Sequence, residues 1–339
     1  MRKNSSRVVP LISITQPAAS PAVASPATTA AVERFRGRAE QGSANTRRAQ
    51  AADLRSFEDY CATHGFKPYP AAVATLSNYV AHLAELPRKL ATIQRHLASI
   101  QRQHQLKRLK SAVGTSALLL VMQGIALDLG TKQKQAPAFS VSHLKACVQR
   151  LDLATAAGLR DRALLLLGFA GAFRRSELVA IDLEHLELDP DGLIVRLGRT
   201  KTNQTGTAEE KTFFYTQKTL YCPIRAYQDW RAQLGGRTAG PLFVSIPRGS
   251  DAEPGVPTAQ RLSTNSVNTL IGRHLGCNST GQRYTAHSFR SSFITTAKLA
   301  GQSNDFIRNQ TKHKTDAILS RYTRLENVKA YNAGKALGL

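Results

Sequence analysis

The chain has 339 residues, enough for two folded domains, and 42% of them are hydrophobic, which excludes a wholly disordered protein. Lys and Arg number 46 against 23 Asp and Glu, and the formal net charge of +23 indicates a polyanionic partner, nucleic acid before an anionic membrane surface. The longest apolar stretch, ALLLLGFAGAF, contains glycine and falls short of the roughly 18 apolar residues of a membrane span. We therefore expect a soluble, cytoplasmic protein that works at the nucleoid, away from membranes.

We expect residues 1–44 to be a disordered tail, because they are rich in Ala, Ser, Thr and Pro and carry little periodic hydrophobicity. Prolines interrupt any apolar core after MRKNSSR, so a secretory signal is not indicated. From residue 45 to 130 apolar residues recur at helical spacing, as in Ile93, Leu97 and Ile100, and predict a domain of about four helices. A polar, basic linker at 131–138 leads into a second domain at 139–339.

The helical domain carries basic residues and no acidic residue between Leu86 and Leu127. A merely solvated helix face usually carries both signs, so the absence of acid favours contact with DNA phosphates. The affinity of such contacts falls steeply as salt rises. The candidate DNA-binding residues are Arg88, Lys89, Arg95, Arg102, Lys107 and Arg108, with Lys110 after them.

The cysteines indicate a reducing compartment. Cys61, Cys147, Cys222 and Cys277 are widely spaced, form no CxxC pair and have no histidines at zinc-finger spacing. We expect reduced, structural thiols, and we predict neither a bound metal nor another cofactor.

The second domain is expected to open with helices at VSHLKACVQRL and GLRDRALLLLGFAGAF, the latter apolar enough to be buried. It leads into FRRSELV, where Arg174 and Glu177 lie one helical turn apart and Arg175 is a neighbouring alternative to Arg174. An arginine at the start of a helix offers a planar fork of donors to two phosphate oxygens. Glu177 would orient that arginine or cap the helix. The alternative is an ordinary surface pair at i,i+3.

A strand hairpin is expected next, because LIVRLG and KTFFYT alternate as strands do and DPDG before them is a turn signal. The polar segment between the two strands contains Lys201, in RTKT. Acidic residues lie at alternating positions into the turn, at Asp182, Glu184, Glu187, Asp189 and Asp191. That alternation favours a solvent-facing edge over a metal site.

Further helices are expected at CPIRAYQDWRAQL, SVNTLIGRHLG and TAHSFRSSFITTAKLAG. In the last of these, His287 and Arg290 share one face at i,i+3, while Phe289 and Phe293 turn toward the core. H-x-x-R thus presents two donors to one phosphate.

The segment TKHKTDAILSRYTRL places His313 nine residues before Tyr322. Arg321 and Arg324 flank the tyrosine, which suits a side chain that must approach DNA.

The motifs R-x-S-E-L, a hairpin lysine, H-x-x-R and a histidine nine residues before a tyrosine occur in the order and setting of the tyrosine recombinase (phage integrase) family, which residues 45–335 resemble. The resemblance implies that Tyr322 is the nucleophile of DNA cleavage and that Lys201 protonates the departing 5′ oxygen. The groups that it implies around the phosphate are Arg174, His287, Arg290 and His313, with Glu177 in support. One departure is Lys312, at a position before the histidine where the family commonly has glycine.

The resemblance further implies a mainly α fold with a small antiparallel β-sheet, in which a helical core-binding domain and a mixed α/β catalytic domain form a C-shaped clamp on DNA. It implies cleavage and rejoining through a 3′-phosphotyrosine and a Holliday junction, with no metal or ATP. It also implies a homo-tetramer on two duplexes at a specific recombination site. Either His287 or His313 would accept the tyrosine proton.

Other interpretations follow from the same residues. A type IB topoisomerase shares the tyrosine chemistry, but the helical domain and the short chain argue against it. A non-catalytic DNA-binding protein is disfavoured because all six catalytic positions are filled, and a metal-dependent transposase because no spaced carboxylate triad appears. After Tyr322, the residues Leu325, Val328 and Tyr331 lie at i,i+3 spacing, so this tail would dock on a neighbouring protomer or pack on its own domain.

Overall fold

The computed structural model describes most of the chain, in residues 30–35, 37, 43–131, 135–198, 209–247, 255–313, 315, 316 and 319. The chain divides into two compact units, Met1–Gln133 and Lys134–Leu339. Within the stretch 1–44 that the sequence predicts to be disordered, residues 30–35 are helical and helix α2 begins at Ala44.

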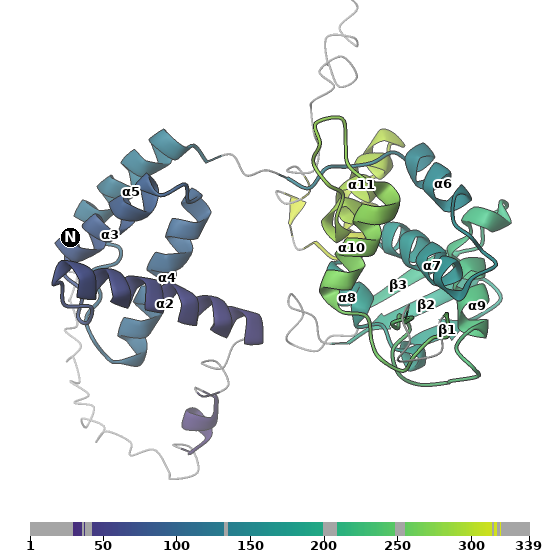
Figure 1. Cartoon of the computed structure of the whole chain (residues 1–339), viewed down its shortest axis with the longest axis horizontal. Helices are drawn as coiled ribbons and strands as arrows, with labels where there is room; N and C mark the ends of the chain where they lie inside the picture. Colours follow the sequence, from purple (N-terminus) through teal and green to yellow (C-terminus); the bar gives the residue numbers. More distant parts are fainter. Residues whose placement is uncertain are drawn as a thin grey trace, which may run out of the picture. The chain divides into compact units, whose positions relative to one another are not determined.

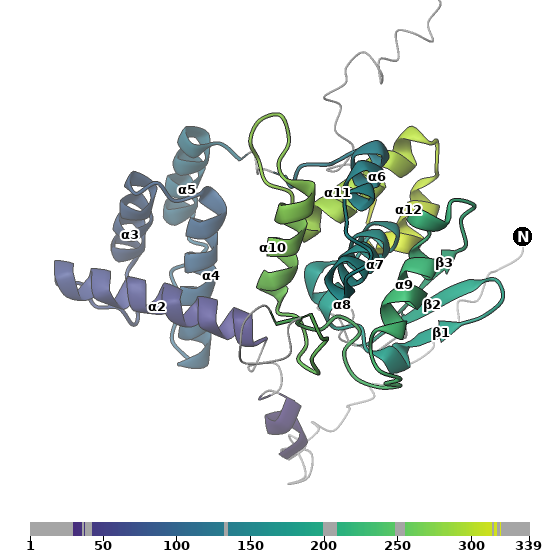
Figure 2. The same ribbon diagram turned by 45° about the vertical axis from the view of Figure 1, so that its right-hand side comes forward.

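The first unit is built from the helices α2 (Ala44–His64), α3 (Val73–Glu85), α4 (Leu90–Leu106) and α5 (Ser116–Leu129), drawn in purple to blue in Figure 1. Ser43 begins α2 by accepting a hydrogen bond from the Thr46 N–H, and Gly65 ends it in the left-handed conformation, with φ of 69°. The apolar faces of the four helices meet in one core around Phe57, Tyr79 and other fully buried side chains. Figure 2 shows α2 running across α4, against which it packs.

A buried acidic residue ties α2 to α4. Asp53 is 1% exposed, and its carboxylate accepts two hydrogen bonds from the Arg95 guanidinium, at 3.0 and 2.8 Å. Ser99 donates to the same carboxylate at 2.9 Å, and His96 lies 3.1 Å from it. A buried carboxylate needs such partners, because an unpaired charge in the interior is costly.

The second unit is arranged around α7 (Ala156–Ala170), which is buried over most of its length and runs through the middle of the unit (Figure 1). It packs against α6 (Val141–Gln149), α9 (Pro223–Ala232) and α11 (Ala286–Leu299). The remaining helices are α8 (Arg175–Val179), α10 (Thr264–Leu275), α12 (Asn304–Thr311) and the 3-10 turns η1 (Leu183–His185) and η2 (Thr219–Tyr221).

A three-stranded antiparallel sheet lies beside α9, with β1 (Leu186–Leu188), β2 (Gly192–Leu197) and β3 (Glu209–Phe214) in the order β1-β2-β3. Asp189 shapes the turn between the first two strands by accepting from the Asp191 and Gly192 N–H groups. The predicted fold class, mainly helical with a small antiparallel sheet, is confirmed.

The acidic residues near the turn are engaged in the fold. Asp182 pairs with Arg261, and Glu187 pairs with Arg196 on the exposed surface of the sheet. In the part of the chain that the structure describes, no group of three or more His, Cys, Asp or Glu side chains is placed to hold a metal ion. All four cysteines are free, and only Cys277 is exposed. No described helix has the length and apolar character needed to cross a membrane.

Candidate active site

The first predicted site residue, Arg174, stands at the N-terminal end of α8. Its backbone N–H donates to the Glu177 carboxylate at 2.9 Å, and its guanidinium donates to the other carboxylate oxygen at 2.5 Å. The Glu177 side chain is 3% exposed, while that of Arg174 is 21% exposed. The buried carboxylate therefore fixes an arginine side chain that is itself partly exposed.

Helix α11 supplies the next two predicted residues. Arg290 is 2% exposed and His287, in the first turn, is exposed. The helix lies close to α7 because Gly168 leaves room for the Phe289 ring: a Cβ on that glycine would lie 2.5 Å from a ring carbon. The predicted inward orientation of Phe289 holds, and Phe293 is partly buried.

His313 follows α12 through a tight turn. Lys312, the C-cap of α12, adopts the left-handed conformation with φ of 54°. Few residues other than glycine or asparagine adopt this conformation at low cost, which explains why glycine suits this position. The chain thus forms this turn with lysine at a position where the family commonly has glycine. The Thr311 hydroxyl donates its one hydrogen to the Ile307 carbonyl oxygen at 2.8 Å, so the His313 Nδ1–H, 2.9 Å away, donates to Thr311.

Both predicted site histidines have lowered pKa values, and the same two arginines contribute to each shift. Burial lowers the pKa of His313 to about 3, with further contributions from Arg290, Arg174 and Lys211. Partial desolvation by its surroundings and then Arg290, Arg175 and Arg174 lower the pKa of His287.

The carboxylate of Glu177 responds to the same cations. Its burial opposes ionisation, but Arg174, through charge and hydrogen bonds, and Arg290 hold its pKa below the usual range. A site in which two arginines depress the pKa of two histidines has an excess of positive charge and is suited to bind an anion such as phosphate.

The sequence did not single out Lys211, which the structure places beside this site. It is 1% exposed, on the inward face of β3 with Phe213, and its ammonium contributes to the low pKa of His313. The alternation of the strand, in which Lys211 and Phe213 share a face, was the signal that pointed to its burial.

Two predicted catalytic residues, Lys201 and Tyr322, lie outside the described residues. The structure brings together the other four and Glu177.

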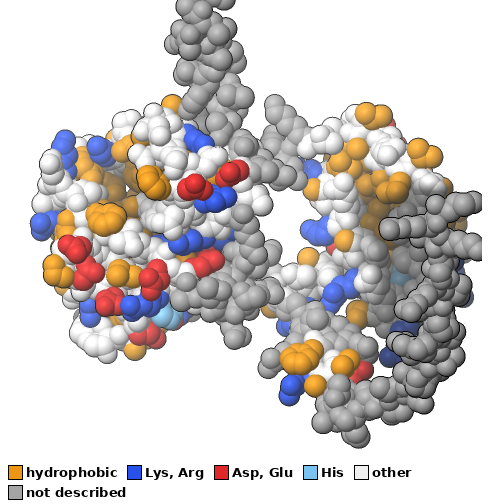
Figure 3. Space-filling view, turned by 180° about the vertical axis from the view of Figure 1, so that it is seen from behind, with side chains coloured by type: hydrophobic (Ala, Val, Ile, Leu, Met, Phe, Trp, Pro, Cys, Tyr) orange, Lys and Arg blue, Asp and Glu red, His pale blue; other side chains and the backbone are white. Residues whose placement is uncertain are grey.

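The predicted DNA-binding residues of the first unit differ in their surroundings. Arg88, Lys89, Lys107 and Arg108 are exposed, and the Lys107 ammonium lies 4.6 Å from the centre of the Tyr69 ring. Arg102 is half-buried. Arg95 is exposed over half of its side chain, but Asp53 holds its guanidinium. In Figure 3 the visible face of this unit, on the right, carries scattered Lys and Arg with little acid, whereas the other unit shows both signs together.

The second unit combines a buried central helix, a three-stranded antiparallel sheet and a site of arginines and histidines on three different helix ends. Comparison with known proteins identifies the class to which this domain belongs.

Residues 141–328 match the Phage integrase family. The integrase/recombinase xerD homolog of Selenomonas ruminantium is 31% identical over 298 residues, which cover 85% of this chain and 84% of that protein. The Tn1549 transposon integrase in complex with transposon right end DNA has a similar fold, with a TM-score of 0.60 and 12% identity over 86% of this chain and 92% of that one. A lambda integrase dimer bound to a core site gives a TM-score of 0.55 and 13% identity over 87% and 94%.

The chain belongs to the phage integrase family, the tyrosine recombinases. It is a DNA recombinase, and site-specific recombination is the function that its relatives support. Neither a topoisomerase nor a non-catalytic DNA-binding protein finds support among them.

Proposed function

We propose that the chain cleaves and rejoins DNA at a specific site through a covalent 3′-phosphotyrosine on Tyr322. The observation that carries this proposal is the convergence of Arg174, Arg290, His287 and His313, from three separate segments, into one positively charged site. A scissile phosphate in that site would meet two guanidinium groups and two imidazoles.

The arginines act on the transition state. When a nucleophile attacks the phosphorus, negative charge grows on the non-bridging oxygens, and donors fixed in advance stabilise that charge at no further cost of reorganisation. Glu177 fixes Arg174, and burial in α11 fixes Arg290. By analogy with loss of one oxyanion donor, each arginine accounts for a factor of about a hundred to a thousand in rate.

Proton transfers complete the reaction. His313 has a strongly lowered pKa and is therefore neutral at physiological pH in the DNA-free protein, so its imidazole is able to accept a proton. His287, whose pKa is also lowered, is neutral as well, so either imidazole is able to assist deprotonation of Tyr322. Lys201 donates a proton to the departing 5′ oxygen, which would otherwise leave as an alkoxide.

We propose that no metal or ATP is required. The two arginines supply the positive charge that a two-metal site would otherwise bring to the phosphate. The phosphotyrosine diester retains the energy of the cleaved bond, so that a 5′ hydroxyl from another duplex is able to reverse the reaction.

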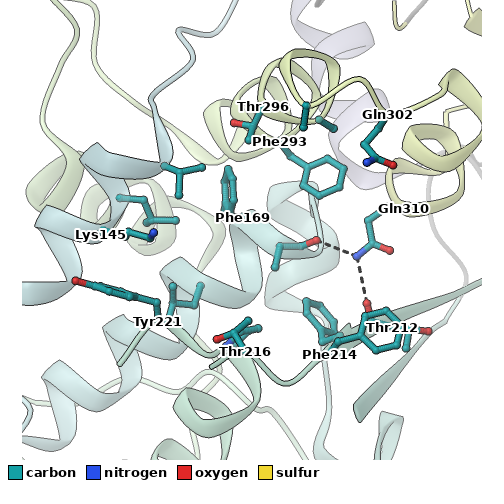
Figure 4. Close-up of a pocket in the computed structure, with 18 of the residues that line it drawn as sticks. Lys145, Phe169, Thr212, Phe214, Thr216, Tyr221, Phe293, Thr296, Gln302 and Gln310 are labelled. Atoms are coloured by element: carbon teal, nitrogen blue, oxygen red, sulfur yellow. Dashed lines mark hydrogen bonds between the residues drawn. The ribbon is translucent and has the colours of Figure 1, made fainter. Parts of the chain in front are cut away.

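We propose that four protomers act on two duplexes through a Holliday junction. An apolar groove of about 840 Å³ lies on the second unit, lined by α6, α7, β3, α11 and α12, and Phe169, Phe214 and Phe293 face into it (Figure 4). The tail after Tyr322, with Leu325, Val328 and Tyr331 at helical spacing, is a suitable occupant of the groove of a neighbouring protomer. The C-shaped clamp of two domains around DNA stays a prediction.

The substrate sets the location. A DNA recombinase meets its substrate at the nucleoid of the cytoplasm, and a gene of a mobile element is a fitting source for an integrase of this kind. Arg88, Lys89, Lys107 and Arg108, all exposed, would contact DNA phosphates from the first unit.

Covalent trapping tests the proposal. The full chain is incubated in EDTA with nicked duplexes that carry the DNA flanking its own gene, and the products are separated by denaturing electrophoresis. We expect a protease-sensitive DNA adduct with the wild type and with Tyr215→Phe, an exposed tyrosine away from the site, and none with Tyr322→Phe. An adduct in Tyr322→Phe, or binding of this DNA by the wild type without an adduct, would contradict the proposal.

A second assay separates recombination from relaxation. Two labelled duplexes that each carry the cleavage site are mixed with the protein, and supercoiled DNA with the same site is treated in parallel. We expect joined products that contain both labels. Relaxation of the supercoiled DNA without exchange between duplexes would favour topoisomerase activity instead.

A further inference from the structure

A lysine ammonium is buried behind the site, where three elements of the second unit meet. The Lys211 Nζ donates to the Gly171 carbonyl oxygen at 2.6 Å and to the Gln310 carbonyl oxygen. It also lies 5.0 Å from the centre of the Phe173 ring. The side chain is 1% exposed, so these groups replace water around the charge.

The two carbonyl groups belong to the C-terminal ends of two helices. Gly171 is the C-cap of α7, and Gln310 is in the last turn of α12. The last carbonyl groups of a helix have no partner within it, and the helix dipole gives this end a partial negative charge. The Lys211 ammonium therefore satisfies both ends at once and joins two helices that would otherwise repel each other there.

The Gln310 side chain also donates hydrogen bonds to the neighbouring elements. Its amide Nε2 donates to the Ala170 carbonyl oxygen at 2.9 Å and, more weakly, to the Thr212 carbonyl oxygen at 3.5 Å, as the dashed lines in Figure 4 show. Lys211 and Gln310 thus connect α7, β3 and α12 through four hydrogen bonds, and we call this set of contacts the junction.

Each joined helix end leads directly into a predicted site residue. Gly171 is three residues before Arg174, and Gln310 is three residues before His313. Both short connections pass through a non-glycine residue with positive φ, Ala172 at 45° and Lys312 at 54°. Because such turns have little freedom, a shift of either helix end moves the site residue that follows it.

We propose that Lys211 is a positioning residue for DNA strand transfer: its ammonium joins the C-terminal ends of α7 and α12 and thereby sets the separation of Arg174 and His313. The inference rests on the proposed assignment of those two residues to the active site. Lys211 acts through the backbone in this arrangement, because two of its three N–H donors bind the Gly171 and Gln310 carbonyl oxygens.

The junction is sensitive to pH and to DNA. Burial lowers the pKa of Lys211 to about 7, and the charges that face it are Arg290 from α11, Glu177 from α8, Lys312 after α12 and Arg174; only Glu177 favours the ammonium. A DNA phosphate bound by the arginines adds negative charge to the site and raises the pKa of Lys211. DNA binding therefore takes up a proton when the pH is above 7.

The test compares Lys211→Met with the wild type and with Lys67→Met, an exposed lysine of the first unit. Single-turnover adduct formation is measured at saturating DNA from pH 6 to 9, and DNA affinity is measured separately. We expect Lys211→Met to lower the cleavage rate by about tenfold to a hundredfold, as misplacement of reacting groups does, with DNA affinity nearly unchanged. Cleavage by Lys211→Met at the wild-type rate would overturn the proposal.

A substrate with sulfur in place of the bridging 5′ oxygen separates positioning from proton donation. A thiolate leaves without protonation, so this DNA restores the rate of a variant that lacks the general acid. We expect it to rescue Lys201→Met and to leave Lys211→Met slow. Rescue of Lys211→Met would overturn the positioning role, because it would make Lys211 the proton donor.

Gln310→Ala gives an independent measure if Lys211→Met does not fold. It removes two of the four hydrogen bonds and leaves Lys211 in place, so we expect a smaller loss of cleavage rate without rescue by the sulfur substrate. An unchanged cleavage rate in Gln310→Ala would contradict the proposal that these hydrogen bonds position the site residues. If the wild type forms no adduct at all, the proposed active site fails, and that outcome is distinct from every result above.

Discussion

Glu177 holds Arg174 from two sides, through the arginine's backbone N–H and through its guanidinium. Replacing Glu177 with Gln removes the charge and leaves a single acceptor oxygen. We expect the rate of adduct formation to fall by about tenfold or more, because a guanidinium that is free to move stabilises the transition state less well. Single-turnover cleavage at saturating DNA measures this.

The substitution Glu177→Gln is also expected to change how the free energy of unfolding depends on pH. The folded protein holds the pKa of Glu177 below its ordinary value of 4.5, so the carboxylate contributes stability above pH 4.5 that is lost as the pH falls through the lower folded pKa. We expect the unfolding free energy of Glu177→Gln to fall less steeply with acid below pH 4.5 than that of the wild type. Parallel curves for the two proteins would contradict the ion pair.

Lys312 carries a backbone conformation that glycine adopts more easily. We expect Lys312→Gly to raise the free energy of unfolding by up to about 1 kcal/mol, because the left-handed conformation costs a residue with a Cβ about that much. Chemical denaturation measures the change. Lys312→Ala keeps the strain and removes the charge, so a stabilisation equal in both variants would show that charge, and not φ, is responsible.

Much of the second unit was predictable because its signals are local. The periodicity of apolar residues located α9, α10 and α11, and the i,i+3 spacing of His287 and Arg290 placed them on one helix face. The turn signal at DPDG and the alternation after it located β2 and β3. These features depend on residues a few positions apart, which a sequence displays directly.

Contacts between residues that are far apart in the sequence were not predictable from such local signals. Arg95 was expected to contact DNA, but its guanidinium pairs with Asp53, which lies 42 positions earlier in the chain. Lys211 was overlooked for the same reason: its partners, Gly171 and Gln310, lie 40 and 99 positions away. A single sequence gives the face on which a charged side chain lies, whereas its partner depends on how the helices pack.

His313 is predicted to be neutral throughout the physiological range. Burial and the neighbouring cations lower its pKa from 6.5 to about 3. NMR of the imidazole protons, assigned by comparison with His313→Gln, is expected to show no titration of this ring between pH 8 and 5 in the DNA-free protein. A midpoint near 6.5 would contradict both the burial of the ring and the influence of the neighbouring cations.

The unfolded state, in which His313 titrates near 6.5, binds more protons than the folded state between pH 3 and 6.5. The titration of His313 therefore leaves the free energy of unfolding unchanged above pH 6.5 and lowers it progressively as the pH falls from 6.5 toward 3. We expect the stability of His313→Gln to depend less on pH in that window. Thermal unfolding in buffers from pH 7 to 4.5 measures the difference.

Two helical glycines are expected to respond in opposite ways to the same substitution. A Cβ on Gly168 would lie 2.5 Å from the Phe289 ring, so Gly168→Ala should destabilise the chain by about 1–3 kcal/mol and displace α11 with Arg290. Gly124, in α5, is exposed and has nothing within 4 Å of the same position. Gly124→Ala should stabilise the chain by about 0.5–1 kcal/mol.

Equal effects of these two substitutions on the free energy of unfolding would show that the contact between α7 and α11 tolerates an added methyl group. Cleavage gives a second measure, since only Gly168→Ala displaces a predicted site residue. We expect its adduct formation to be slower even at temperatures where it is fully folded.

Arg88 and Arg95 separate DNA contact from structural pairing within the first unit. Arg88 is exposed, so Arg88→Ala is expected to weaken DNA binding and to lower the slope of log affinity against log salt by about 1. Arg95→Ala instead leaves Asp53 buried without its bidentate partner, and we expect a loss of about 1–3 kcal/mol in stability because Ser99 and His96 remain. Salt titrations of DNA binding, paired with denaturation of each variant, distinguish the two roles. A reduced salt slope in folded Arg95→Ala would show that this arginine leaves Asp53 to contact a phosphate.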